Sequence, residues 1–242
     1  MRGKTLIITG ASLGIGRALA LELASNGVNL VLNARHQPPL REVAAGCEGL
    51  GAAVAQVAGN AANPRVAETL VAKALEVGKF HGFIHAAGVL HPGPFLWELP
   101  PDHFDEVIKS HVVAAYQLVR AAIPHLLRQA EGLAVFFGSH AAVSNLPGLG
   151  AYNIAKAAEE HLARQLAQEA PEIVSFVFRP GVTETRMQKQ AREAKGGAAS
   201  ILHRHFRAYL ESGSLAAPEQ AARRLLSYLL HDPRRFHGRI VE

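Results

Sequence analysis

The sequence predicts an α/β fold, a single doubly wound parallel sheet with helices on both faces. Short apolar runs rich in β-branched residues alternate along the chain with longer segments of helical periodicity. The apolar runs are uninterrupted, which is typical of strands that are buried on both faces of a parallel sheet. A glycine-rich turn directly after the first run is the third observation, because such turns join strand to helix in dinucleotide-binding sheets.

Seven strands and five helices are predicted, and no repeat or linker separates them, so residues 1–242 form one domain on this interpretation. Strand–helix alternation at this spacing indicates right-handed βαβ units. Proline at or near the first helical position marks two helix starts, at Asn63-Pro64 and at Pro100-Pro101-Asp102. The predicted strands are residues 4–9, 28–33, 53–57, 82–86, 133–138, 174–179 and 239–241. The predicted helices are residues 14–26, 64–77, 102–129, 152–169 and 218–230.

The segment 185–213 interrupts the run of sheet elements after the sixth strand. It is helical in propensity and contains Gly196-Gly197, a predicted hinge. In a doubly wound sheet such a segment lies over the carboxyl ends of the strands, where ligands bind. We therefore expect a helical substrate lid, and a packing excursion without a role in binding is the alternative.

The net charge is +5, and the whole surplus lies in the last quarter of the chain. Residues 179–242 hold 12 Lys and Arg against 6 Asp and Glu, whereas residues 1–178 hold 13 against 14. A nucleic-acid footprint is one interpretation. The charges are scattered along predicted helices without interleaved aromatic residues. A solvated helix face, or a basic rim around an acidic cofactor, is therefore favoured over a nucleic-acid partner.

Composition argues against several other classes of protein. No run of about 18 apolar residues is present, so no membrane-spanning helix is predicted. The first five residues lead directly into a strand and do not resemble a signal peptide. The single cysteine, Cys47, has no partner for an internal disulfide, which fits a reducing, cytoplasmic location. The 13 histidines do not supply the pair of ligands and the carboxylate of a zinc-binding helix, so no metal site is predicted.

The turn from residue 10 to residue 16 predicts a phosphate-binding site. Gly10 permits the tight turn after the first strand, Gly14 allows the backbone to approach phosphate, and Gly16 allows close packing of helix on strand. The helix that starts here presents its N-terminus to a pyrophosphate. We expect a dinucleotide cofactor at this turn.

The end of the second strand indicates which dinucleotide binds. An acidic residue there would bind the ribose 2′-hydroxyl, whereas an arginine pairs with a 2′-phosphate. The chain reads Asn33-Ala34-Arg35-His36, without a carboxylate. Arg35 therefore favours NADP(H) over NAD(H), and an ordinary surface arginine is the alternative.

Tyr152 and Lys156 form the most informative pair in the chain. Residues four apart on a helix lie on one face. An ammonium group beside a phenol favours the phenolate. A phenol tuned in this way exchanges a proton with substrate as ketone and alcohol interconvert, so Tyr152 is the candidate general acid/base.

The glycine turn, Ser139, the Tyr152/Lys156 pair and the stretch from Pro180 to Thr185 resemble the short-chain dehydrogenase/reductase family over essentially the whole chain. The resemblance implies a Rossmann-type fold, a nicotinamide cofactor, and a homodimer or homotetramer. It also implies that Ser139 hydrogen-bonds the substrate oxygen and that Lys156 holds the nicotinamide ribose. The implied cofactor-binding residues are Gly10, Ser12, Leu13, Gly14, Ile15, Gly16, Arg35, Asn60, Ala87, Gly88, Tyr152, Lys156, Pro180, Gly181, Val182 and Thr185.

Towards the C-terminus the chain is similar to the sepiapterin reductase and benzil reductase branch of this family, which reduces vicinal dicarbonyls and related ketones with NADPH. The similarity lies in residues 180–188, 209–213 and 236–242. Members of the branch carry a carboxylate near the end of the last strand, and Glu242 stands at that place. As the last residue, Glu242 is alternatively a frayed terminus. The expected substrate contacts are Ser139, His140, Leu146, Met187 and Glu242.

Three positions depart from the family pattern. His85-Ala86-Ala87-Gly88 stands where the family has Asn-Asn-Ala-Gly, Asn60 replaces an aspartate near the adenine, and His111 replaces a catalytic asparagine that holds a proton-relay water. Histidine bonds water and titrates near neutral pH, so His111 is a candidate catalytic residue. Packing is the alternative for His85 and His111.

The predicted function is NADP(H)-dependent hydride transfer to a small ketone or dicarbonyl. One alternative is a 3-oxoacyl-thioester reductase of fatty-acid synthesis. The other is a non-catalytic, nucleotide-sensing protein of the same fold, which the altered asparagine positions would suit.

Overall fold

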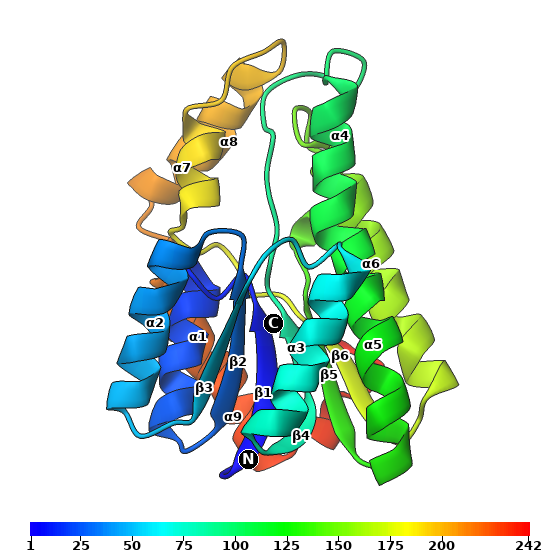
Figure 1. Ribbon diagram of the computed structural model, residues 1–242. Coiled ribbons are helices and arrows are strands. Elements are labelled where there is room, and N and C mark those ends of the chain that lie inside the picture. Colours follow the sequence, from blue (N-terminus) through cyan, green and yellow to red (C-terminus); the bar gives the residue numbers. More distant parts are fainter.

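Seven parallel strands form one sheet in the computed structural model, which describes residues 1–242 (Figure 1). The strands are β1 Lys4–Thr9, β2 Asn29–Ala34, β3 Val54–Ala58, β4 Lys79–His85, β5 Gly132–Phe137, β6 Ile173–Phe178 and β7 Ile240–Val241. Their order is β3-β2-β1-β4-β5-β6-β7, and every neighbouring pair is parallel. The direction of winding therefore reverses between β1 and β4, the topological switch point at which such sheets bind ligands.

Helices cover both faces of the sheet. They are α1 Gly14–Ser25, α2 Gln37–Gly49, α3 Pro64–Val77, α4 Pro101–Ile108, α5 Ala114–Gln129, α6 Gly150–Glu169, α7 Arg186–Arg192, α8 Ala199–Glu211 and α9 Pro218–His231. One apolar core lies between the sheet and α1, α2 and α9, and a second lies between the sheet and α3, α5 and α6. None of the helices is both long and apolar enough to span a membrane.

Successive residues of β1 contribute to the two different cores. Leu6 and Ile8 belong to the core beneath α1, and Ile7 belongs to the core beneath α3. All three side chains are fully buried, and each such burial contributes roughly 1.5–3 kcal/mol. Because both faces of the sheet are covered, the strands are apolar throughout rather than alternating. The sheet is therefore a rigid base for the loops at its carboxyl edge.

The predicted fold class is confirmed. Each strand begins and ends within three residues of its predicted range. The helix α2 was not predicted, because its first turn contains Pro38 and Pro39 and the helix also contains two glycines. Proline is compatible with the first turn of a helix, where its missing N–H would have no intrahelical partner. The predicted helix 102–129 is divided into α4 and α5 by a π-turn at Lys109–Val113.

Helices α4, α7 and α8 rise above the carboxyl edge of the sheet, with α4 on one side and α7 and α8 on the other (Figure 1). The segment 185–213 is largely helical, as predicted, and contains α7 and α8. Gly196 and Gly197 pack against the loop after β4: an added Cβ would lie 2.6 Å from the nitrogen of Pro94 at Gly196 and 2.5 Å from the ring of Phe95 at Gly197. The two glycines therefore allow close packing of the two segments, a different role from the predicted hinge.

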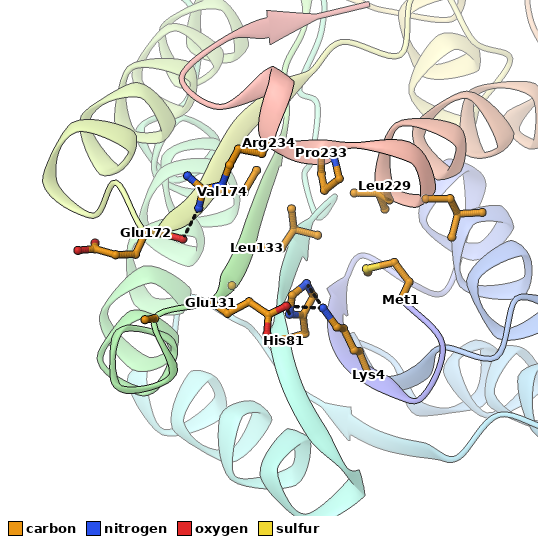
Figure 2. Close-up of a pocket in the computed structure, with 13 residues that line it drawn as sticks. Met1, Lys4, His81, Glu131, Leu133, Glu172, Val174, Leu229, Pro233 and Arg234 are labelled. Carbon is orange, nitrogen blue, oxygen red and sulfur yellow. Dashed lines mark hydrogen bonds and ion pairs between the residues drawn. The ribbon is translucent and has the colours of Figure 1, made fainter.

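A cavity of about 320 Å³ opens at the opposite, amino edge of the sheet (Figure 2). Lys4, His81 and Glu131 point toward one another beside it. Glu131 lies 2.5 Å from Lys4, 3.2 Å from Lys79 and 3.8 Å from His81. None of the predicted site residues lines this cavity. The residues predicted to carry the chemistry follow the strands at the other edge.

Candidate active site

The first glycine turn lies against the loop after β4, at the switch point of the sheet. Gly10 has a φ angle of +69°, and an added Cβ would lie 2.7 Å from the Cα of Ala87. An added Cβ at Gly16 would lie 2.3 Å from the carbonyl oxygen of Gly10. Side chains are therefore excluded at both positions, which keeps β1, β4 and α1 in close contact. No side chain caps the N-terminus of α1, so its first N–H groups are available to a phosphate.

The loop after β6 reaches the same turn. An added Cβ at Gly14 would lie 3.6 Å from Cγ2 of Thr185. Thr183 in this loop forms an isolated bridge with Ala216, just before α9. Gly181 has a φ angle of +70°, which turns the chain after β6. The structure thus brings the predicted residues of three loops together at one place: residues 10–16 after β1, Ala87-Gly88 after β4, and 180–185 after β6.

Tyr152 and Lys156 lie on α6, one turn apart, as their spacing predicts. The ammonium nitrogen of Lys156 is 5.7 Å from the centroid of the Tyr152 ring. It donates to the carbonyl oxygen of Phe137 at 2.6 Å and to the carboxylate of Glu159 at 2.8 Å. An ammonium has three N–H donors, so one remains for a further acceptor.

Ser139 follows β5, and a buried carboxylate of α6 holds its backbone. The N–H of Ser139 donates to Oε1 of Glu160 at 3.2 Å, and its Oγ accepts from the N–H of Ala141 at 3.2 Å. Two 2.8 Å hydrogen bonds join Glu160 to Arg179, and they raise the pKa of that guanidinium. This arrangement fixes Ser139 relative to the helix that carries Tyr152. Neither Glu160 nor Arg179 was singled out from the sequence.

His111 lies in the π-turn between α4 and α5, a type of turn that is frequent at functional sites. Its ring packs edge-on against Tyr152, with centroids 5.3 Å apart at 78°. The ring also occupies the space beside Gly88, where an added Cβ would lie 2.1 Å from Cε1 of His111. Its Nε2 is 3.0 Å from the oxygen and 3.2 Å from the nitrogen of Val89. His111 is therefore enclosed between the predicted proton donor and the loop after β4.

Four buried titratable side chains meet beneath Tyr152: Lys156, Glu159, His85 and His111, which we call the buried charge cluster. The Glu159 side chain is 0% exposed. Its oxygens lie 2.8 Å from Lys156, 3.5 Å from Nδ1 of His111 and 4.0 Å from Nε2 of His85. His85 in turn is hydrogen-bonded through Nδ1 to the hydroxyl of Thr9, 2.8 Å away at the end of β1. Glu159 was not predicted from the sequence, although a charged residue at i+3 from Lys156 on a buried helix face was an available signal.

The environment of the cluster determines its charge states. Burial opposes ionisation, but the attraction between the two groups raises the pKa of Lys156 and lowers that of Glu159, so they form an ion pair. Burial lowers the pKa of His85 to about 4 and also lowers that of His111. Both imidazoles are therefore neutral at pH 7. The cluster consists of one ion pair flanked by two neutral rings.

Arg35 lies at the end of β2, as predicted, and is paired with a carboxylate that the sequence did not place there. Its guanidinium is 2.5 Å from Glu106 on α4. The other oxygen of Glu106 is 2.7 Å from His91, whose ring stacks on His103 with centroids 3.9 Å apart. The hydrogen bond from His91 is the main reason why the pKa of Glu106 is lowered. Asn60 is exposed, and its side chain accepts from the N–H of Ala62.

Of the residues predicted to contact substrate, some pack beside Tyr152 and others are exposed to solvent. Leu146 and Met187 pack with Tyr152 around a small apolar cluster whose buried members are Leu90, Leu149, Ala191, Ala194 and Leu202. His140 is exposed at the start of a short 3-10 turn. The Glu242 carboxylate is 3.9 Å from Arg179, and its side chain is 71% exposed. The structure thus builds an apolar wall beside Tyr152 and leaves Glu242 largely in solvent.

The fold is that of an oxidoreductase which binds a nicotinamide cofactor. Residues 4–196 match the family model described as short chain dehydrogenase. The chain belongs to the short chain dehydrogenase family.

Three known proteins illustrate the relationship. The chain is 36% identical over 151 residues to L-rhamnose 1-dehydrogenase (NAD(P)(+)) of Sphingomonas sp. (strain SKA58), a match that covers 62% of this chain and only 57% of that protein. It is 32% identical over 189 residues to the NADPH-dependent pterin aldehyde reductase of Arabidopsis thaliana, covering 76% of each chain. It matches the crystal structure of L-sorbose reductase from Gluconobacter frateurii complexed with NADPH and L-sorbose with a TM-score of 0.86 and 26% identity, covering 100% of this chain and 95% of that chain.

Proposed function

We propose that the protein is an NADP(H)-dependent carbonyl reductase that acts on a small ketone or vicinal dicarbonyl. The observation that carries this proposal is the pairing of Tyr152 with Lys156 on one face of α6. The glycine turn at the neighbouring switch point accounts for a dinucleotide. Membership of the short chain dehydrogenase family and relatives that are named as NADPH-dependent reductases give further support.

Each catalytic residue has a distinct role in this proposal. A bound nicotinamide supplies the hydride. Tyr152 donates a proton to the substrate oxygen, and the hydroxyl of Ser139 polarises that oxygen by a hydrogen bond. Lys156 stabilises the phenolate that remains, and its third N–H holds the nicotinamide ribose. His111, enclosed between Tyr152 and Val89, takes the position of the residue that supports proton return.

Arg35 supplies the preference for NADP(H) over NAD(H). A guanidinium at the end of β2 pairs with a 2′-phosphate through charge-assisted hydrogen bonds. One relative is named as NADPH-dependent and another is named with NAD(P)(+), which fits a preference rather than strict selection. When the 2′-phosphate binds, the Arg35 guanidinium leaves its ion pair with Glu106 and pairs with the phosphate instead.

The apolar cluster around Tyr152 favours small, partly apolar carbonyl compounds. Leu146 and Met187 supply its walls, and α7 and α8 act as the lid. The lid is bonded to the loop after β4, because the N–H of Ala198 donates to the carbonyl oxygen of Gly93 at 2.9 Å. The N–H of Gly93 in turn donates to Gly148, before α6, at 2.9 Å. A pterin carbonyl is the more specific candidate. The relative that is a pterin aldehyde reductase supports it, and Glu242, which is exposed beside Arg179, is available to bind the pterin.

We also propose a homodimer or homotetramer that is assembled through α5 and α6. Large apolar side chains are exposed on these two helices, at Tyr116, Leu127 and Ile154. Burying them against a second copy removes apolar surface from water. Light scattering after size-exclusion chromatography gives the mass directly, and a monomer at micromolar concentration would contradict this part of the proposal.

A panel of carbonyl compounds tests the activity. Purified protein is incubated with NADPH or NADH and with benzil, a pterin aldehyde, L-sorbose or an acetoacetyl thioester, and absorbance of the reduced nicotinamide is followed. Consumption of NADPH with benzil or the pterin supports the proposal. Turnover of the thioester alone identifies a 3-oxoacyl-thioester reductase. NADPH binding without turnover of any compound identifies a nucleotide-sensing protein.

A further inference from the structure

The buried charge cluster contains a carboxylate that the proposed chemistry does not itself require. Glu159 is fully enclosed, and its Oε1 has no hydrogen-bond partner. Nδ1 of His111 and Nε2 of His85 are also buried without partners. An unpaired buried polar atom is unfavourable by about 1–3 kcal/mol. A buried carboxylate that faces Lys156, His111 and His85 provides an acceptor for each of these possible donors.

The position of Glu159 decides which nitrogen of His111 carries the proton. Val89 offers Nε2 both a donor and an acceptor, because its N–H lies at 3.2 Å and its carbonyl oxygen at 3.0 Å. Val89 therefore fits either tautomer. Nδ1, in contrast, faces only the carboxylate of Glu159, at 3.5 Å. A lone pair on Nδ1 would be repelled there, whereas an N–H would be attracted.

We propose that Glu159 is a positioning residue: its carboxylate holds the Lys156 ammonium and selects the Nδ1–H tautomer of His111. The roles of Lys156 and His111 in turnover rest on the proposed function. The tautomer does not, since it follows from Glu159 and Val89 alone.

The selected tautomer has a consequence for the loop after β4. With the proton on Nδ1, Nε2 of His111 accepts from the N–H of Val89 and makes no bond with the Val89 carbonyl. That carbonyl is then available as an acceptor beside the site. The same loop carries Gly88, against which the His111 ring packs, and Leu90 of the apolar cluster. Glu159 thus acts on Lys156 directly and on this loop through His111.

The cluster also links the catalytic helix to the glycine turn. The Thr9 hydroxyl is hydrogen-bonded to Nδ1 of His85, and Nε2 of His85 lies 4.0 Å from the Glu159 carboxylate. Thr9 immediately precedes Gly10. A chain of side chains from β1, β4, α6 and the π-turn therefore connects the end of β1, where the glycine turn starts, to Lys156. The charged and titratable groups that face Glu159 are Lys156 from α6, His85 from β4 and His111 from the π-turn, and the ring centroid of Tyr152 lies 5.7 Å from the Lys156 ammonium nitrogen.

Long-range nitrogen–proton correlation spectra of protein with labelled histidine test the tautomer without any turnover. The His111→Asn variant identifies the His111 signals. We expect a proton on Nδ1 in the wild type and its loss from Nδ1 in Glu159→Leu, which offers no acceptor, with Glu159→Asp retaining it because the carboxylate remains. A proton on Nε2 in the wild type, or no change in Glu159→Leu, would overturn the proposal. The matched control is Glu169→Leu, at an exposed position on the same helix that is bonded to Gln165.

The pH profile of reductive turnover tests the effect on Lys156. The attraction of Glu159 raises the pKa of the Lys156 ammonium, so removing this negative charge favours loss of the ammonium proton. The proposed function requires the charged ammonium, so the fall of kcat at high pH moves to lower pH in Glu159→Gln. A uniformly lower kcat with an unmoved profile would reduce Glu159 to a structural role. If the wild type turns over no carbonyl compound, the proposed function fails, and the spectra still decide the inference.

Discussion

The two edges of the sheet carry nearly the same set of charged groups in opposite surroundings. At the amino edge Glu131 lies among Lys4, Lys79 and His81, and its side chain is 45% exposed. At the carboxyl edge Glu159 lies among Lys156, His111 and His85, and is 0% exposed. The strand β4 even contributes a histidine to each set, His81 near its start and His85 at its end.

Solvent makes the difference between the two sets. The amino-edge carboxylate is screened by water, so its ion pairs contribute little to stability. The carboxyl-edge carboxylate is not exposed to solvent, so every charge there acts on its neighbours through a medium of low polarisability. The same kinds of side chain therefore form an ordinary surface network at one edge and a buried network beside the proposed catalytic groups at the other.

The largest expected effect comes from Tyr152, the proposed proton donor, which lies beside the buried charge cluster. Tyr152→Phe removes the phenolic hydroxyl and keeps the ring that packs on His111. General acid catalysis is worth about 10²–10⁴-fold, so kcat should fall by that factor in steady-state assays. The Kd for NADPH, measured by fluorescence, should change little. Full turnover by the variant would remove Tyr152 from the mechanism.

A matched pair of substitutions compares the edges directly. Glu159→Gln leaves a buried ammonium without its counter-ion and should lower the free energy of unfolding by about 3 kcal/mol. Glu131→Gln makes the same chemical change in a screened setting and should lower it by less than about 1 kcal/mol. Urea denaturation measures both. Equal losses would mean that burial does not distinguish the two carboxylates.

The histidines of β4 make stability depend on pH. Burial lowers the pKa of His81 and of His85 from 6.5 to about 4, so the fold keeps both neutral. The unfolded chain binds protons first as pH falls. This contribution to stability is therefore complete above about pH 6.5 and is lost as pH falls toward 4. His81→Asn should reduce the loss over this window by on the order of 2 kcal/mol, as measured by urea denaturation at several pH values.

Glu131 titrates at lower pH than the two β4 histidines, so its titration is distinguishable from theirs in the pH dependence of stability. Its hydrogen bonds with Lys4 and Lys79 lower its pKa from 4.5 to about 2. The stabilisation from this carboxylate is present above pH 4.5 and is lost only as pH falls through about 2. A wild type whose stability is flat between pH 6.5 and 4 would contradict the neutral state of both β4 histidines.

Features that depend on local spacing were predictable from the sequence, whereas features that depend on tertiary contacts were not. The glycine turn and the Tyr152/Lys156 pair are set by spacings of a few residues, and the apolar strands are set by burial. Glu106 is 71 positions from Arg35 along the chain, and Arg179 is 19 from Glu160. No local pattern reports such pairs. The π-turn at His111 was not predicted either, because its residues are equally compatible with a continuous α-helix.

The smallest expected effect concerns the other carboxylate that the sequence did not reveal. Glu106 holds Arg35 in an exposed pair, so it competes with a 2′-phosphate for the same guanidinium. Glu106→Gln should therefore strengthen NADPH binding several-fold, about 1 kcal/mol, and leave NADH binding nearly unchanged. Asp105→Asn is the matched control, because Asp105 is a neighbouring carboxylate on α4 that pairs with Lys109 instead.

The ratio of the two dissociation constants, measured by titration of the bound nicotinamide fluorescence, separates the possible causes. A gain for NADPH in Glu106→Gln but not in Asp105→Asn assigns the effect to the Arg35–Glu106 pair. Equal gains in both variants would instead indicate a general electrostatic effect of the negative charge on α4, and this effect would weaken as the salt concentration rises. An unchanged NADPH affinity in Glu106→Gln, together with an unchanged affinity in Arg35→Ala, would show that Arg35 does not bind the 2′-phosphate. Screening by solvent therefore limits the effect of Glu106 on NADPH affinity, as it limits the effect of Glu131 on stability. The proposed effect of the enclosed Glu159, in contrast, is on the protonation of its neighbours.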